Sequence, residues 1–155
     1  MSAVESRLAE LGYTLPPPPE PIGNYQSASR SGNIMWMSGV GSRRADGSRI
    51  SGKLGADLTV EQGYEAARWC ALNLLARMKV ELGDLDRVTG ILKVVGMVNS
   101  SLNFEEQAKV VDGASDLFLA VFGDAGKHSR SAPGMAVLPR NTAVIVDCVL
   151  EITED

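Results

Sequence analysis

One arginine in the sequence stands where it could bind a small anion. Arg130 lies in the run His128-Ser129-Arg130-Ser131, just ahead of an apolar segment typical of a strand. A guanidinium at the start of a strand can reach into a cleft and hold a carboxylate with two parallel hydrogen bonds. A surface arginine at a strand start fits the same pattern, so the residues alone leave both interpretations open.

His128 is a second candidate, because histidine titrates near neutral pH and can act as a general base. It is the only histidine of the chain, and a solvated loop residue beside Gly126 and Lys127 is the alternative interpretation. One histidine and two distant cysteines, Cys70 and Cys148, make neither the usual zinc ligand set nor a disulfide framework. We therefore expect no metal site and a reducing setting.

Two glycine-containing runs resemble nucleotide-binding motifs but lack the required context. Gly39-Val40-Gly41 has no third glycine and no helix directly after it. The run from Gly123 to Lys127 follows a helical segment rather than a strand. The chain also lacks a Gly-x-Ser-x-Gly nucleophile motif. These patterns predict glycine bends and loops.

Charge and hydropathy narrow the class of protein further. The 155 residues carry 15 Lys and Arg against 19 Asp and Glu, and the net charge of −4 has the wrong sign for a main partner made of nucleic acid. No stretch approaches the roughly eighteen apolar residues of a membrane span, and charged residues interrupt the N-terminal segment. We expect a globular protein in the cytoplasm, without a signal peptide.

The first twenty residues predict a short helix and a stiff tether. Ser2 to Glu5 is a capping box, and Val4 and Leu8 fall on one helical face before Gly12. Pro16 to Pro19 then favour an extended polyproline segment that crosses a surface. We expect residues 1–20 to be an extension of one domain that spans residues 1–155.

Two long helices and five strands are expected in the rest of the chain. Apolar residues recur at three- and four-residue steps from the capping box at Thr59–Gln62 to Gly83. Asn103 is expected to cap a second long helix that ends at Gly123, with Phe104 and Ala108 among its inward residues. Alternating or β-branched apolar runs predict strands at 24–30, 34–40, 88–98, 131–137 and 142–152.

This order of elements predicts an α+β fold: a mixed sheet with two long helices packed on one face, plus the short N-terminal helix. Such a two-layer domain leaves the other sheet face bare. The run Ile34-Met35-Trp36-Met37 is apolar on both faces of its strand. We therefore expect self-association to cover the bare face.

Three runs of residues carry a resemblance to a known family. They are Ile22-Gly23-Asn24-Tyr25, Met37-Ser38-Gly39 and the long run from Arg130-Ser131-Ala132 to Leu138-Pro139. Together they resemble the YjgF/RidA family of reactive intermediate deaminases, also known as endoribonuclease L-PSP-like proteins. The resemblance covers about residues 21–152, and the N-terminal extension is similar to that of a longer, less studied branch.

The resemblance implies a chorismate-mutase-like fold assembled as a homotrimer, with clefts between subunits. It implies that Arg130 grips the carboxylate of a small 2-imino acid of the 2-aminoacrylate type. Ser38 takes part in the same catalytic site, and the substrate pocket is lined by Tyr25, Gly39, Ser131 and Ala132. Water replaces the imine nitrogen to give a 2-keto acid and ammonia, which requires no metal or other cofactor.

Two positions depart from the family pattern and keep other functions open. Ala132 stands where the family has a pocket cysteine, and Ile145 stands where it has an acidic residue on the last strand. Asp147 follows two residues later on the same strand face. A trimer that binds small carboxylates without turnover is therefore the alternative. RNA cleavage is less favoured, because the chain is acidic and has a single histidine.

Overall fold

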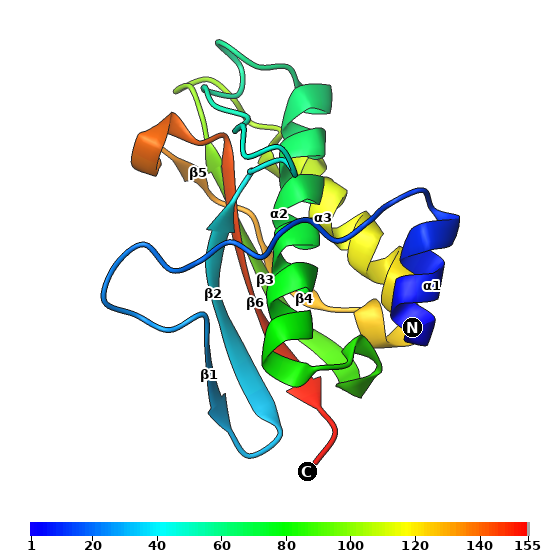
Figure 1. Ribbon diagram of the computed structural model, residues 1–155. Coiled ribbons are helices and arrows are strands. Elements are labelled where there is room, and N and C mark those ends of the chain that lie inside the picture. The colour runs from blue at the N-terminus through cyan, green and yellow to red at the C-terminus, as the bar shows by residue number, and fades with distance from the viewer. Residues whose placement is uncertain (155) are drawn as a thin grey trace.

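The structure, a computed structural model, describes residues 1–154 as one mixed β-sheet with helices packed on one of its faces (Figure 1). The six strands have the order β1-β2-β6-β3-β4, and β5 also pairs with β3. The strands are β1 (Ala28–Ser31), β2 (Ile34–Gly41), β3 (Val88–Asn99), β4 (Ser129–Ser131), β5 (Gly134–Met135) and β6 (Val144–Ile152). The helices are α1 (Ala3–Glu10), α2 (Val60–Leu82) and α3 (Gln107–Phe122), with 3-10 turns η1 (Leu85–Arg87), η2 (Gly123–Gly126) and η3 (Pro139–Asn141). The predicted α+β class, with two long helices on one face, is confirmed.

Helix α2 is central and has the predicted ends. The Thr59 hydroxyl accepts the backbone N–H of Gln62 at 3.2 Å, and the Gln62 side chain accepts the backbone N–H of Thr59 at 2.9 Å. Gly83 ends the helix at a φ of 75°, where glycine is favoured. Most residues between 66 and 78 are buried, because α2 packs against the sheet and against α3.

Helix α3 begins later than the sequence predicts. Asn103 does not cap it, because the backbone N–H of Phe104 donates to the carbonyl of Ser101 and closes a turn there. The helix begins at Gln107, and the residue before it makes no side-chain capping bond. Phe104 packs partly against the core, but Ala108 is exposed. The predictions of the Asn103 cap and of an inward Ala108 were therefore wrong.

Helices α2 and α3 approach each other most closely at Gly113. A Cβ atom on Gly113 would lie 2.0 Å from the carbonyl oxygen of Tyr64, far inside van der Waals contact. Three residues along α3, Asp116 accepts a hydrogen bond from the Tyr64 hydroxyl at 2.7 Å, which raises the pKa of Tyr64 to about 12. The absence of a side chain at Gly113 lets the two helices approach closely, and the hydrogen bond between Tyr64 and Asp116 holds them at that distance.

Replacing Gly113 by alanine is expected to force the two helices apart and to lower stability by about 1–3 kcal/mol. Chemical denaturation of the variant beside Gly90→Ala measures this, because a Cβ on Gly90 would meet its nearest neighbour at an ordinary 3.7 Å. Equal stability of the two variants would show that the helix contact does not constrain the fold.

One predicted strand is shorter than expected, and another is divided into two. The first strand begins at Ala28 rather than residue 24. The predicted strand at 131–137 is instead two short strands on either side of Pro133, β4 and β5, both parallel to β3. Proline has no N–H to donate to a sheet, and here its carbonyl accepts the backbone N–H of Val98. The sequence run was apolar enough for a strand, but its proline breaks the pairing.

Burial alternates along the strands and defines two sheet faces. In β6 every second residue from Val144 to Ile152 is buried under the helices, and those between are half-buried. In β2, Met35 and Met37 also point to the helices, so Ile34 and Trp36 of the predicted apolar run face the open side. The apolar residues of the open face include Ile34, Trp36, Val95, Met97, Ile145 and Val149. Self-association over this face stays a prediction.

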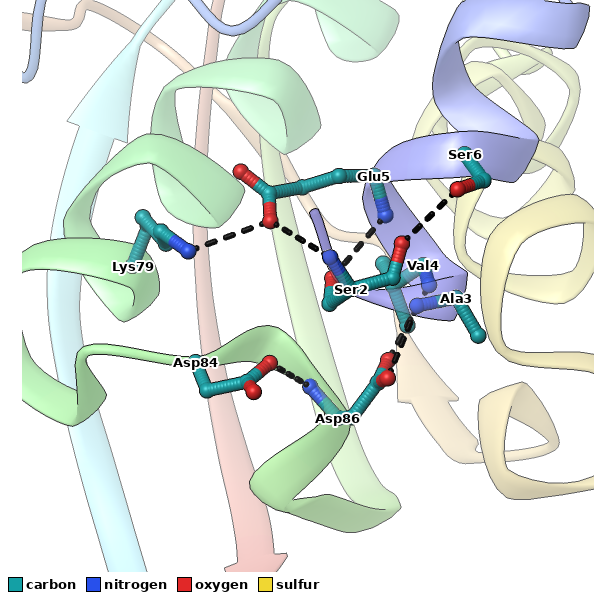
Figure 2. A network of polar contacts seen from close by, with 8 residues as sticks. All are labelled: Ser2, Ala3, Val4, Glu5, Ser6, Lys79, Asp84 and Asp86. Carbon is teal, nitrogen blue, oxygen red and sulfur yellow. Dashed lines mark hydrogen bonds and ion pairs between the residues drawn. The ribbon is translucent and has the colours of Figure 1, made fainter.

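Helix α1 begins with the predicted capping box and is tied to α2 (Figure 2). The Ser2 hydroxyl accepts the backbone N–H of Glu5 at 3.1 Å, and a Glu5 carboxylate oxygen accepts the backbone N–H of Ser2. The same carboxylate oxygen lies 3.1 Å from Lys79 Nζ on α2. Val4 and Leu8 on the inner face of α1 are buried. The N-terminal helix is thus packed on the domain.

A carboxylate from a distant turn also holds the first turn of α1. Asp86 in η1 accepts the backbone N–H groups of Ala3 and Val4 at 2.7 and 3.0 Å (Figure 2). Its own backbone N–H donates to Asp84 at 2.9 Å, which fixes the turn. The two N–H bonds to the carboxylate lower the pKa of Asp86. Asp86 therefore completes the cap that Ser2 begins.

Asp86→Ala is expected to cost about 1 kcal/mol of stability at neutral pH, as the loss of a helix cap does. The lowered pKa means that the contribution is fully present above the ordinary aspartate value of 3.8 and is lost as the pH falls through the folded-state value. Denaturation at pH 7 and pH 3, beside the exposed control Glu10→Ala, measures this. A difference from wild type that persists unchanged at pH 3 would contradict the charge-based cap.

Among the described residues, no helix combines the length and apolar character needed to cross a membrane.

Candidate functional site

Arg130 lies on edge strand β4 and points to the helix side of the sheet. Its register partner on β3 is Val94, which is buried under the helices. The guanidinium reaches α3, where Nη1 donates to Asp112 Oδ1 at 2.7 Å and to Ser115 Oγ at 3.1 Å. Nη2 donates to the backbone carbonyl of Ala108 at 3.2 Å. The predicted carboxylate-binding arginine is thus held by a carboxylate of its own chain.

These bonds limit what Arg130 can bind inside one chain. The side chains of Arg130 and Asp112 are 22% and 49% exposed, so the ion pair is only partly screened by water. An arginine has five N–H groups, and the three bonds leave the Nε–H and one Nη2–H outside them. A ligand carboxylate at Arg130 must therefore share the guanidinium with Asp112 or displace it.

His128 has a defined hydrogen-bond pattern next to Arg130. Its Nδ1 lies 2.6 Å from the carbonyl of Gly126, which can only accept, so Nδ1 carries the proton of the neutral ring. Nε2 then accepts the hydroxyl of Ser115 at 2.8 Å. The ring of Phe118 contacts the imidazole edge to face. His128 is therefore a packed and hydrogen-bonded residue rather than a solvated one.

Asp112, Ser115, His128 and Arg130 line one shallow hollow, together with Leu119 and Lys127. His128 and Arg130 are recognisable candidates in the sequence, whereas Asp112 and Ser115 are not. Their only sequence signal is a three-residue spacing on one face of α3, which carries no chemical signature. The tertiary packing of α3 against β4 brings them to the site.

Of the other predicted site residues, Tyr25, Ser38 and Gly39 lie on or beside β2. Gly39 and Tyr25 line a cleft, and the Tyr25 hydroxyl accepts the backbone N–H of Ile22 at 3.2 Å. The Ser38 hydroxyl donates to the carbonyl of Gln26 at 2.6 Å, which ties β2 to the segment before β1. Ser131 and Ala132 lie instead with Arg130, where the Ser131 hydroxyl accepts Lys93 Nζ at 3.0 Å and Ala132 packs against the core.

The two groups of predicted residues do not meet within one chain. Between β2, which carries Ser38 and Gly39, and β4, which carries Arg130, lie the strands β6 and β3 (Figure 1). Neighbouring strands are about 4.8 Å apart, so three spacings separate the groups by about 14 Å. A pocket that contains both groups therefore requires a second copy of the chain.

Asp147 lies on the open sheet face beside Ser38 and Gly39. The register of β2 with β6 passes from Met37–Cys148 to Val40–Val146 through a bulge, which leaves Asp147 across from Ser38–Gly39. Ile145 is on the same face, two residues away, and a Cβ on Gly39 would lie 2.9 Å from its side chain. Burial raises the pKa of Asp147. The chain thus places a carboxyl group two residues along β6 from Ile145, the position at which the family acid was expected, and on the same face of the sheet.

Residues 5–152 match the model of the family "YjgF/chorismate mutase-like, putative endoribonuclease". The chain belongs to this family. The predicted family and chorismate-mutase-like fold are thereby confirmed, and the match extends into α1, which sequence analysis placed before the region of resemblance.

Similar proteins cover nearly the whole of this YjgF-family chain. Protein TCP17 of Trypanosoma cruzi is 45% identical over 96% of the chain and 94% of its own length. A crystal structure of a "putative endoribonuclease" from Shewanella oneidensis is 38% identical, with a TM-score of 0.93 over 96% of this chain and 99% of that one. The protein Atu1372 of Agrobacterium tumefaciens, of unknown function, is 39% identical, with a TM-score of 0.91 over 97% and 93%. The N-terminal extension is thus within the part shared with these relatives.

Nowhere in residues 1–154 do three or more His, Cys, Asp or Glu side chains gather in a way that could hold a metal ion.

The Arg130–Asp112 ion pair is expected to contribute to stability, unlike an exposed pair of the same length. Asp112→Asn should cost about 1 kcal/mol, because it weakens a partly buried, charge-assisted hydrogen bond of 2.7 Å. Asp124→Asn removes the partner of Lys127 at the same 2.7 Å, but there the side chains are 93% and 72% exposed, so no measurable change is expected. Thermal denaturation of both variants at low and high salt is the measurement. Equal changes in stability for the two variants would show that the partly buried Arg130–Asp112 pair stabilises the fold no more than the exposed pair does.

Proposed function

We propose that the protein is a cofactor-independent enamine/imine deaminase that hydrolyses small 2-imino acids to 2-keto acids and ammonia. One observation carries the proposal: the half-buried carboxyl group of Asp147 lies across from Ser38–Gly39, in the region that the family resemblance assigns to the substrate. The resemblance to the YjgF/RidA deaminases implies the same reaction class, and the chain belongs to the YjgF family. Its endoribonuclease label fits less well, since the net charge of the chain is −4.

Asp147 has the properties of a proton donor in this reaction. Its raised pKa keeps the carboxyl group protonated to a higher pH than an ordinary aspartate. The protonated carboxyl donates to the imine nitrogen while water adds to carbon C2, and the carboxylate then takes up the proton released by that water. Asp147 then donates its proton to the amino nitrogen of the resulting amino alcohol, the C–N bond breaks, and ammonia leaves. The hydroxyl proton on C2 passes to the Asp147 carboxylate, which restores the acid, and C2 becomes the carbonyl carbon of the 2-keto acid.

Arg130 is the residue that we assign to the substrate carboxylate. Arg130 lies on β4, at the opposite edge of the sheet from Ser38 and Gly39 on β2. The proposed site therefore combines the open sheet face of one copy, which carries Asp147, with the β4 edge of another copy. The half-exposed apolar residues of the open face, Trp36 among them at 45%, favour such an assembly. A homotrimer, as in the resemblance, is the proposed form.

A binding protein without turnover is the second candidate, and a specific observation favours it. Asp112 already neutralises Arg130, and two apolar residues, Ala132 and Ile145, occupy positions where the family carries polar ones. Such a protein would hold small carboxylates in the same intersubunit cleft. It would be stabilised by them without releasing ammonia.

Release of ammonia and keto acid from freshly generated imino acids tests the proposal. Asp147→Asn is expected to lower the rate by about 10²- to 10⁴-fold, the usual contribution of an acid–base group. Arg130→Ala is expected to cost about 2–5 kcal/mol in substrate binding. Glu151→Gln, on the same face of β6, is the matched control and should keep its activity.

The pH profile adds a second readout. Wild-type activity should fall as the pH rises through the raised pKa of Asp147, because the protonated form donates, and Asp147→Asn should lack this limb. Carboxylate-dependent thermal stabilisation without ammonia release would instead establish the binding protein. Full activity of Asp147→Asn would remove Asp147 from the mechanism.

A further inference from the structure

A cleft at the edge of the sheet gathers three arginines around an opening of about 100 Å³. Strand β1 pairs only with the first half of β2, up to Met37, so residues 39–41 border this cleft instead of a strand. The arginines are Arg43, Arg49 and Arg77, and the only acidic side chain among the described lining residues is Glu20. The lining therefore carries a net charge of +2.

Arg77 is the unusual member of the cluster. It lies on α2, is 3% exposed, and its Nε donates to the carbonyl of Pro19 at 2.5 Å. Its Nη1 atom is buried and has no hydrogen-bond partner. Buried polar atoms of folded proteins almost always have a partner, and a buried cationic group without one is costly. Arg77 therefore carries a buried cationic donor that no described side chain or backbone group satisfies.

The proline tether builds one wall of the cleft. Residues 16–19 run across α2 toward β1, and the Pro19 carbonyl fixes the Arg77 side chain by its Nε (Figure 1). Arg77 also borders a hollow on the other side of this tether, but that hollow contains Glu20 and Glu81 and no further arginine or lysine among its described lining residues. An anion is therefore expected to bind in the cleft that contains Arg43 and Arg49 rather than in this second hollow.

Arg43 and Arg49 are brought together by the backbone. They are directly opposed in an isolated antiparallel bridge, which places two like charges on neighbouring positions. The Asn73 side chain donates to the carbonyls of Gly41 and Arg43, at 3.3 and 2.8 Å, and holds this segment against α2. Like charges so placed repel each other unless an anion lies between them.

We propose that this cleft binds a dianionic phosphate group, free or as the end of a small metabolite. Guanidinium groups bind phosphate oxygens with paired, charge-assisted hydrogen bonds, and the net charge of +2 matches a dianion. An opening of about 100 Å³ has room for a small tetrahedral oxyanion. The three arginines come from one chain. The cleft also contains Tyr25 and Gly39, which the resemblance assigns to the substrate pocket, but the arginine cluster does not include Arg130 or Asp147 of the proposed deamination.

Titration of the full-length protein with inorganic phosphate, followed by calorimetry and ³¹P NMR at constant ionic strength, tests this site. Saturable binding at one site per chain is expected. Arg43→Ala and Arg49→Ala should each weaken it about tenfold or more, as the loss of a charge-assisted hydrogen bond does. Arg44→Ala is the matched control, because Arg44 lies beside Arg43 but its Nε is 3.8 Å from Glu65, and phosphate affinity should change less than about twofold.

Further arms decide the chemistry of the ligand. A phosphate monoester should bind as inorganic phosphate does, whereas acetate at the same concentration should not compete. Arg77→Lys, which keeps a cation but loses the second N–H fork, should weaken phosphate binding while circular dichroism shows an intact fold. Equal weakening by the Arg44 variant, equal binding of acetate, or no saturation would each overturn the proposal. Because the titration contains no imino acid, its outcome is independent of the deaminase assay.

Discussion

The contact of two backbones at Gly113 sets the distance between α2 and α3, and much of the molecule depends on that distance. With no side chain at this position, α3 lies against the carbonyl of Tyr64 on α2. Asp112 and Ser115, on either side of Gly113, then face edge strand β4 and hold the Arg130 guanidinium. The same serine orients His128. A shift of α3 would therefore move the whole polar cluster.

The sheet divides the functional groups between two edges. Arg130 and its partners on α3 lie at the β4 edge, while Tyr25, Ser38 and Gly39 lie at the β2 edge, with Asp147 on the open face beside the latter two. This separation gives a physical reason for an oligomer that does not depend on apolar area alone. An intersubunit site would join a carboxyl group from one copy to an arginine from another.

The arginines of the chain differ in what neutralises them. Arg130 is paired with Asp112, but the buried Arg77 has an Nη1 atom with no hydrogen-bond partner and lies beside Arg43 and Arg49. In a protein with a net charge of −4, such a local excess of positive charge is a specific feature rather than a general property of the surface. The chain thus has two structurally different arginine environments, one neutralised by Asp112 and one with a local excess of positive charge.

The sequence by itself determined the features that depend on neighbours along the chain. The capping boxes at Ser2 and Thr59, the end of α2 at Gly83 and the alternation of β6 all follow from residues within a few positions of each other. It also pointed to Arg130 through a recognisable run. Asn103 misled, because a turn to Ser101 competed with the cap, and the strand expected at 131–137 was broken by a proline.

Only the tertiary structure decided where the side chains act. Parallel pairing of β4 with β3 turned Arg130 toward α3, and the β2–β6 bulge put Asp147 opposite Ser38–Gly39. Asp86 caps a helix more than eighty positions away in sequence, and Arg77 is buried by a tether that begins some sixty positions before it. Such contacts join residues whose separation leaves no periodic or local signal, since they are selected by the packing of the whole domain.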